Sequence, residues 1–185
     1  AESDLPVPRT HFLCEDPDEI GAVFFVMDYV SGNVFTNPGL PGLSISERES
    51  VYDQMNLGLA KLHKLNSEML GLSDFGRPGN YFERQYSRWS RQYEASATEH
   101  FPEMEDLQQW LKNNIPEKDG ALCLVHGDWR IDNLMFKIGS FHLAAVIDWE
   151  IPTLGNPLAD LGTQLMQWDM PAGNESRGLS ELDRK

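Results

Sequence analysis

Two short apolar segments in the last third of the chain each end directly in a cluster of polar residues. Residues 122–125 (Leu-Cys-Leu-Val) precede the polar stretch 126–133, and residues 143–147 (Leu-Ala-Ala-Val-Ile) precede Asp148. Short runs of this composition predict buried strands. We therefore expect a fold in which the polar side chains lie in the loops that follow these strands, and loops held by such a scaffold commonly carry function.

The spacing within these clusters is typical of one kind of chemistry. Asp128 and Asn133 are five residues apart, and Asp148 lies fifteen residues beyond Asn133. This is the spacing of the catalytic base and the metal ligands in kinases. A hairpin turn around residues 137–140 would bring Asn133 and Asp148 close together. Amide and carboxylate oxygens suit Mg²⁺, so the pattern predicts phosphoryl transfer to a hydroxyl group.

The middle of the chain predicts helices, and the segment before them predicts a strand. Residues 22–27 are short, apolar and rich in branched and aromatic side chains, which favours a buried strand. One helix begins near Ser44 or Ser46, each followed three residues later by a glutamate, as in a capping box. A second helix begins at Asn80, and a third spans residues 102–114. We therefore expect an α+β fold that is mostly helical.

Composition excludes several classes of partner. Lys and Arg number 15 against 29 Asp and Glu, a formal net charge of −14. That field repels phosphate backbones and anionic lipids, so we expect no nucleic acid and no membrane as partner. No apolar run reaches the ~18 residues of a spanning helix, and the N-terminus lacks the pattern of a signal peptide. Cys14 and Cys123 lie far apart in apolar surroundings, which favours reduced core residues in a soluble, cytoplasmic chain.

Three motifs together resemble the aminoglycoside phosphotransferase and choline kinase-like family. They are His-Gly-Asp at 126–128, Ile-Asp-Trp-Glu at 147–150 and Gly-Asn-Pro-Leu-Ala-Asp-Leu-Gly at 155–162. The resemblance covers about residues 20 to 170. It implies a protein-kinase-like fold, of which this chain would be mostly the helical C-terminal lobe with a small β-hairpin at the active site.

Within that family, one further segment resembles a particular branch. Residues 75–81 (Phe-Gly-Arg-Pro-Gly-Asn-Tyr), leading to Arg88 and Trp89, look like the branch that is fused to acyl-CoA dehydrogenases in animals and free-standing in bacteria. That branch is associated with phosphorylating hydroxyl groups of hydroxyacyl-CoA thioesters. The resemblance thus implies a small-molecule alcohol as acceptor, and fusion to or association with an acyl-CoA dehydrogenase.

The resemblance also implies a role for individual residues, with ATP as phosphoryl donor and Mg²⁺ as the metal. Asp128 would be the catalytic base, and His126 would brace the catalytic loop from inside. Asn133 and Asp148 would be metal ligands beside the nucleotide phosphates. Asp160 would cap the backbone of the loop. The hinge that reads the adenine edge through backbone groups would consist of Met27, Asp28, Tyr29 and Val30.

The predicted second helix carries two stripes at helical spacing. The aromatic stripe favours core packing over a ligand cage and consists of Phe82, Tyr86, Trp89 and Tyr93. The basic stripe consists of Arg84, Arg88 and Arg91. We interpret it first as a solvated face that pairs with local carboxylates. The alternative is a site for an anionic acceptor such as a CoA phosphate.

The chain also departs from the family pattern. The first lysine is Lys61, and no G-x-G-x-x-G precedes Ala22, although kinases need a glycine-rich loop and a strand lysine. We expect residues 1–21 to be an extension or a remnant of the small lobe, 22–170 to be the hinge and C-terminal lobe, and 171–185 to be a flexible tail.

This departure keeps two alternatives to an active kinase open. One is a catalytically inactive, kinase-like binding module, which the missing lysine and glycine-rich loop favour. The other is a metal-dependent phosphoesterase built on His126, Asp128 and Asp148.

Overall fold

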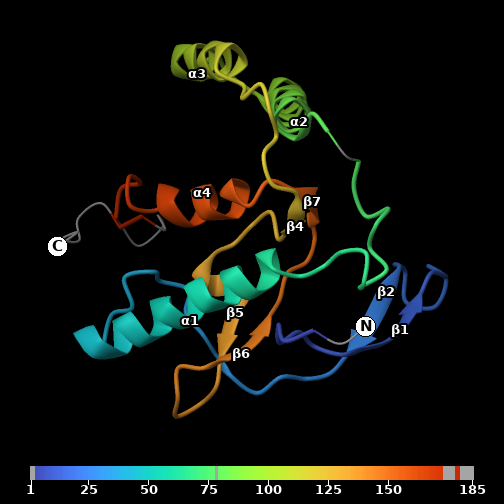
Figure 1. Ribbon diagram of the computed structural model, residues 1–185, viewed down its shortest axis with the longest axis vertical. Coiled ribbons are helices and arrows are strands. Elements are labelled where there is room, and N and C mark those ends of the chain that lie inside the picture. Colours follow the sequence, from blue (N-terminus) through green and yellow to red (C-terminus); the bar gives the residue numbers. More distant parts are fainter. Residues whose placement is uncertain (1–2, 78, 173–177, 180–185) are drawn as a thin grey trace.

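Three strands, three helices, four further strands and a last helix follow one another in a computed structural model that describes residues 3–77, 79–172 and 178–179 (Figure 1). The helices are α1 (Ile45–His63), α2 (Tyr81–Ser96), α3 (Pro102–Asn113) and α4 (Leu158–Met166), with a 3₁₀ turn, η1 (Ile131–Asn133). The strands are β1 (Thr10–Cys14), β2 (Phe24–Met27), β3 (Asn33–Val34), β4 (Cys123–Val125), β5 (Leu134–Phe136), β6 (Leu143–Val146) and β7 (Thr153–Gly155). Both kinds of element contribute, as the predicted α+β class requires.

The beginning of α1 confirms the predicted capping box. The Ser44 hydroxyl accepts a hydrogen bond from the Glu47 N–H at 3.4 Å, and the Glu47 carboxylate accepts one from the Ser44 N–H at 2.7 Å. The Ser44 backbone N–H and hydroxyl hold the pKa of Glu47 below its usual value. The two orphan donors at this helix end are thus satisfied reciprocally.

The beginning of α2 lies where it was predicted but is capped differently. Asn80 has a left-handed backbone, with φ of 52°, and its side chain makes no capping hydrogen bond. Instead, the Tyr81 N–H donates to the carboxylate of Asp119 at 2.7 Å. The cap therefore comes from a residue distant in sequence, which local spacing cannot reveal.

The strands form small antiparallel sheets with the orders β1-β2, β3-β5-β6 and β4-β7. The predicted hairpin is confirmed, because Leu134 pairs with Val146 and Met135 with Ala145. The predicted burial of the first strand is wrong, since Phe25 is 58% exposed and Met27 46%. In these sheets β2 pairs only with β1, in a two-stranded ribbon, and its apolar side chains remain largely exposed.

The core forms where α1 lies against the sheet that carries the candidate site (Figure 1). The predicted apolar face of α1 is confirmed, because its members are all buried: Val51, Met55, Leu59 and Leu62. They pack in one cluster with Trp129, Leu134, Phe136 and Val146. Burying side chains of this size stabilises a fold by about 1.5–3 kcal/mol each relative to exposure. The hairpin and the polar loop before it are thus anchored on a packed helix.

The first 21 residues contact the rest of the chain at two places. Strand β1 lies within 1–21 yet pairs with β2, and Leu5 belongs to the core. The predicted flexible tail falls largely on residues outside the described ones. Of its described members, Leu179 is buried and its N–H donates to the Gln167 carbonyl at 2.7 Å. The predicted domain boundaries stay predictions.

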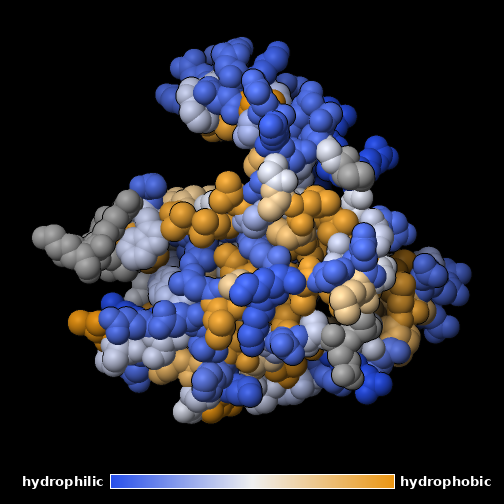
Figure 2. All heavy atoms as spheres, in the orientation of Figure 1, coloured by the Kyte–Doolittle hydropathy of each residue, from blue (hydrophilic) through white to orange (hydrophobic). Residues whose placement is uncertain are grey.

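The surface is mostly hydrophilic over the outer side of α2 and α3, whereas apolar side chains gather in the middle of the same face (Figure 2). Within the described part of the chain, no helix combines the length and apolar character that crossing a membrane requires.

Candidate active site

The hairpin brings two of the predicted site residues together. The N–H of Ile147 donates to the carbonyl of Asn133 at 3.0 Å, so Asp148 follows directly after a residue bonded to Asn133. Asn133 and Asp148 also line the same hollow. Their predicted closeness is confirmed, and it follows from antiparallel pairing of β5 with β6.

All six residues predicted to bind the nucleotide line that one hollow, which has a volume of about 590 Å³. Four come from the segment at and after the end of β2, and two come from the hairpin: Met27, Asp28, Tyr29, Val30, Asn133 and Asp148. Pro8, Met135 and Ile147 add apolar wall. A mostly apolar hollow with a few polar groups at one end is typical of a small-molecule site.

Asp128 lies in the loop between β4 and η1, and two neighbours hold one of its oxygens. Asn133 Nδ2 donates to Asp128 Oδ2 at 3.1 Å and to the Asp128 carbonyl at 2.9 Å. Arg130 Nη2 forms an ion pair with the same Oδ2 at 2.9 Å. The second oxygen, Oδ1, accepts no hydrogen bond from the described residues, which leaves it available to an incoming group.

His126 is completely buried, and both of its ring nitrogens are engaged by backbone. The Nε2–H donates to the Ile147 carbonyl at 2.9 Å, and Nδ1 accepts from the Asp128 N–H at 3.3 Å. These partners specify the neutral ring with its proton on Nε2. The ring also packs on Trp149, with centroids 4.7 Å apart. His126 therefore links the Asp128 loop to the end of the hairpin.

Asp160, in the first turn of α4, is also completely buried and accepts three hydrogen bonds. Its carboxylate accepts from the N–H of His126 at 2.9 Å and from the N–H of Gly127 at 2.8 Å. The third donor is His63 Nε2, at the end of α1, at 2.8 Å. The predicted cap on the loop backbone is present in the structure.

Sequence reasoning missed His63 and Arg130. His63 lies four residues after Leu59, on the buried side of α1, and that spacing was the signal for an inward-facing histidine. Arg130 lies within the motif itself, two residues after Asp128. Its ion pair with Asp128 required the three-dimensional path of the loop, so the spacing alone did not indicate it.

The backbone is unusual at two positions of the site. Asp148 has φ of 66°, in a left-handed region that non-glycine residues rarely adopt outside turns and functional sites. Gly127 has φ of 87°, and a Cβ there would lie 2.8 Å from the Ile151 carbonyl. Both positions flank the candidate site: the strained backbone lies at Asp148, and a side chain at position 127 would collide with the chain at Ile151.

The phosphoesterase alternative loses its support. Among the described residues, no group of three or more His, Cys, Asp or Glu side chains lies close enough to hold a metal ion. Both ring nitrogens of His126 are engaged by backbone groups. A site based on several histidine and carboxylate ligands is therefore not assembled in this part of the chain.

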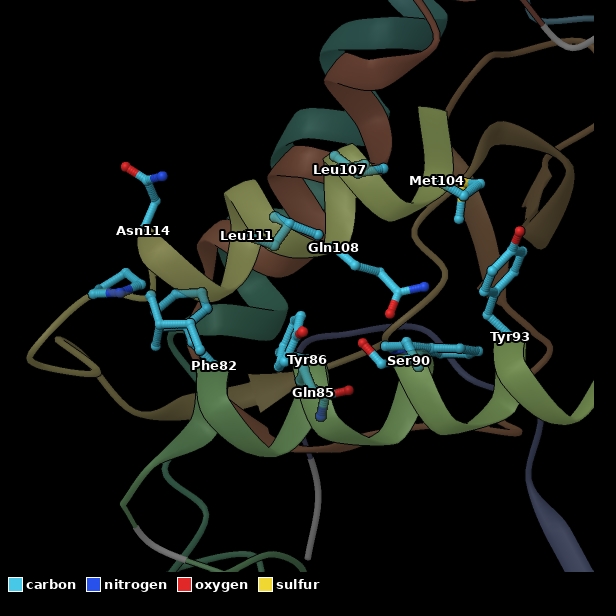
Figure 3. A pocket seen from close by; sticks show the side chains of 13 residues that line it. Phe82, Gln85, Tyr86, Ser90, Tyr93, Met104, Leu107, Gln108, Leu111 and Asn114 are labelled. Carbon is cyan, nitrogen blue, oxygen red and sulfur yellow. The ribbon is translucent and has the colours of Figure 1, made fainter. Parts of the chain in front are cut away.

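The two stripes of α2 also differ from expectation. The aromatic stripe packs against α3 only in part and lines an open apolar groove of about 320 Å³ between the two helices (Figure 3). Trp89 is 46% exposed. Core packing was therefore the wrong expectation, because α2 buries only Tyr81 fully. Local ion pairing was wrong too, since no arginine of the basic stripe pairs with a carboxylate of the described residues.

The two cysteines are free, as expected. Cys123 is buried on β4, whereas Cys14 is half-buried on β1. Burial, together with the charge of Asp160, raises the pKa of the Cys123 thiol to about 11. The thiol beneath the loop therefore stays protonated at neutral pH.

Comparison with known proteins agrees with this geometry. The model of the phosphotransferase enzyme family (APH) matches residues 1–179. Acyl-CoA dehydrogenase family member 10 of mouse is 40% identical over 172 residues, which are 93% of this chain and 16% of that protein. A crystal structure of a Ralstonia eutropha protein assigned as an aminoglycoside phosphotransferase is 44% identical, with a TM-score of 0.88 over 98% of this chain and 55% of that chain.

A more distant neighbour contains a nucleotide. The ternary complex of streptomycin, ATP and APH(2″)-IIa is 20% identical, with a TM-score of 0.59 over 86% of this chain and 52% of that chain. The chain thus spans about a sixth of the mouse relative and about half of each solved chain. The chain belongs to the APH phosphotransferase family and has its protein-kinase-like fold.

Proposed function

We propose that the chain carries the site for ATP-dependent phosphoryl transfer to the hydroxyl group of a small molecule. One observation carries the proposal: the hollow that gathers residues 27–30, Asn133 and Asp148 lies beside the loop of Asp128. Asn133 joins the two, because it lines the hollow and donates to the Asp128 carboxylate. A donor in the hollow and an acceptor at Asp128 would thus meet at one point.

The residues present fit a magnesium nucleotide. The amide nitrogen of Asn133 is used by Asp128, which turns its carbonyl oxygen to other partners. The Asp148 carboxylate is exposed and accepts no hydrogen bond from the described residues. Mg²⁺ commonly takes one or two protein oxygens and completes its shell with phosphate and water. Asn133 and Asp148 would hold the metal, which would neutralise charge on the phosphates.

Asp128 would orient the acceptor and take its proton. Its Oδ1 is the oxygen left available by Arg130 and Asn133, so the acceptor hydroxyl would donate to Oδ1. The hydroxyl oxygen forms a bond to the γ-phosphorus as the bond from that phosphorus to the bridging oxygen breaks. ADP leaves, and the proton passes to Asp128 and then to solvent.

His126 and Asp160 act in this proposal as positioning residues. Asp160 holds the backbone of His126 and Gly127, and the ring of His126 holds the Asp128 N–H. Misplacing a reacting group by about 1 Å can slow a reaction by about 10²-fold. The buried carboxylate of Asp160 therefore matters because it keeps Asp128 correctly positioned beside the hollow.

For the acceptor we propose the hydroxyl group of a hydroxyacyl-CoA thioester. The similarity to a protein named as an acyl-CoA dehydrogenase supports an acyl-CoA context. We also propose that the chain works fused to, or associated with, such a dehydrogenase.

The test is to incubate the chain with Mg-ATP and a panel of hydroxyacyl-CoA thioesters and to detect phosphorylated product by mass spectrometry. We expect a product that gains one phosphoryl group. The Asp128→Asn variant should lose about 10²–10⁴-fold in rate, the usual contribution of a general base. Asp106→Asn, at an exposed position of α3, is the matched control and should keep the rate. Equal rates in the two variants would refute the role of Asp128, and ATP binding without transfer would indicate a binding module instead.

A further inference from the structure

Four arginines line a second, larger hollow beside α2. Arg77, Arg84, Arg88 and Arg91 line this basic hollow, which has a volume of about 910 Å³. We infer that the basic hollow is the place where the phosphate groups of the proposed acyl-CoA acceptor bind. This inference rests on the proposed function and locates the phosphate end of the acceptor at the same site.

The charges of these arginines are not neutralised by neighbouring carboxylates. Among the described residues, none of the four forms an ion pair, and Glu83 is the one carboxylate that lines the hollow. The chain as a whole carries a net charge of −14. Four unpaired guanidinium groups in one hollow repel one another, and that repulsion is relieved when an anion binds.

Local contacts hold part of the set in place. Arg84 Nη2 donates to the Arg77 carbonyl at 2.7 Å, and Arg91 Nε donates to the Ser87 carbonyl at 3.0 Å. The Arg88 guanidinium lies 5.3 Å from the centre of the Trp89 ring. Such contacts use one donor or one face of a guanidinium group and leave further N–H groups for a ligand. Three of the four guanidinium groups thus have local contacts before any ligand binds.

The basic hollow continues toward the candidate active site. Gln85, Arg88 and Thr153 line both the basic hollow and a smaller hollow of about 290 Å³. That smaller hollow reaches Gly127, the residue before Asp128 in the loop. An acceptor whose phosphates lie among the arginines could therefore extend its hydroxyl group toward Asp128.

The chemistry of the lining selects among acceptors. Guanidinium groups bind phosphate oxygens in pairs, with charge-assisted hydrogen bonds that are stronger than neutral ones. Several arginines in one hollow suit a ligand with more than one phosphate group better than a single carboxylate. The same charges repel a cationic acceptor. The basic hollow therefore favours a nucleotide-linked or pyrophosphate-linked alcohol over an amino sugar.

The experiment uses coenzyme A and pantetheine as probes, because pantetheine shares the thiol arm and lacks the phosphates. Binding of each to the chain is measured by isothermal titration calorimetry at two salt concentrations. We expect coenzyme A to bind and pantetheine to bind at least tenfold more weakly. Arg88→Gln and Arg91→Gln should each weaken coenzyme A about tenfold or more, as expected for loss of a charge-assisted hydrogen bond. Lys112→Gln, at an exposed position of α3, is the matched charge control and should leave binding unchanged.

Higher salt should weaken the binding of coenzyme A, because the basic hollow is open to screening. Coenzyme A that binds equally well to the arginine variants and to wild type would overturn the inference, as would pantetheine that binds as tightly as coenzyme A. The proposed function fails separately. If coenzyme A binds through the arginines but no phosphoryl transfer occurs, the basic hollow stands and the transferase does not. If a hydroxyacyl-CoA is phosphorylated with the same rate and KM by the arginine variants as by wild type, the transferase stands and the basic hollow does not.

Discussion

Replacing Asp160 by asparagine tests how the catalytic loop is held. The carboxylate accepts from His126 N–H and His63 at Oδ2 and from Gly127 N–H at Oδ1. An asparagine has one acceptor oxygen. If that oxygen replaces Oδ2, the new NH₂ group faces the Gly127 N–H, and two donors meet in a buried site. A buried unpaired donor costs about 1–3 kcal/mol, and the two remaining bonds lose their charge assistance.

We therefore expect Asp160→Asn to lower the free energy of unfolding by about 2–3 kcal/mol, a large part of the total stability of a domain. Urea unfolding followed by tryptophan fluorescence measures it, since Trp129 and Trp149 both lie against His126. Asp106→Asn, on the exposed side of α3, is the control and should change stability by less than about 0.5 kcal/mol. A change in Asp160→Asn as small as that of the control would refute the argument that this carboxylate holds the loop.

The remaining predictions concern packing and burial. Gly162→Ala, in an open position of α4, should raise the free energy of unfolding by about 0.5–1 kcal/mol through helix propensity. Gly58→Ala should not raise the free energy of unfolding, because its Cβ would lie 2.8 Å from Leu143 Cδ2 and 3.4 Å from Trp129. If urea unfolding shows that both variants are stabilised equally, the packing of α1 described here is contradicted. Burial raises the pKa of Cys123 from 9.0 to about 11, so the folded chain favours the neutral thiol more than the unfolded chain does. The contribution of the buried thiol to the free energy of unfolding should therefore be full below pH 9 and should decline as the pH rises toward 11. In a thiol-reagent assay at pH 8, Cys14 should react in the folded chain and Cys123 only after unfolding. Fast labelling of both thiols in the folded chain would refute the burial of Cys123.

The features that sequence predicted well depend on residues close together in the chain. The capping box of α1 joins Ser44 to Glu47, and the apolar face of α1 follows from helical spacing. The hairpin needs only the turn between β5 and β6. Each can be inferred because the interaction and the pattern span the same few residues.

The features that sequence missed depend on distant contacts. His63 bonds Asp160, 97 residues away, and the cap of α2 comes from Asp119, 38 residues from Tyr81. The exposure of β2 likewise depends on what packs against the ribbon, and its apolar composition does not specify that. Long-range geometry therefore decided which polar groups meet at the candidate site, whereas the motif indicated only which segments of the chain form it.

The most direct test of the central claim is isothermal titration of the chain with Mg-ATP, with Asp148→Ala as the variant and Asp106→Ala as the matched control. The claim is that the hollow bounded by residues 27–30, Asn133 and Asp148 holds the nucleotide. It predicts that wild type and Asp106→Ala bind Mg-ATP and that Asp148→Ala binds at least tenfold more weakly. Absence of binding to wild type, or equal affinity in Asp148→Ala, would contradict it.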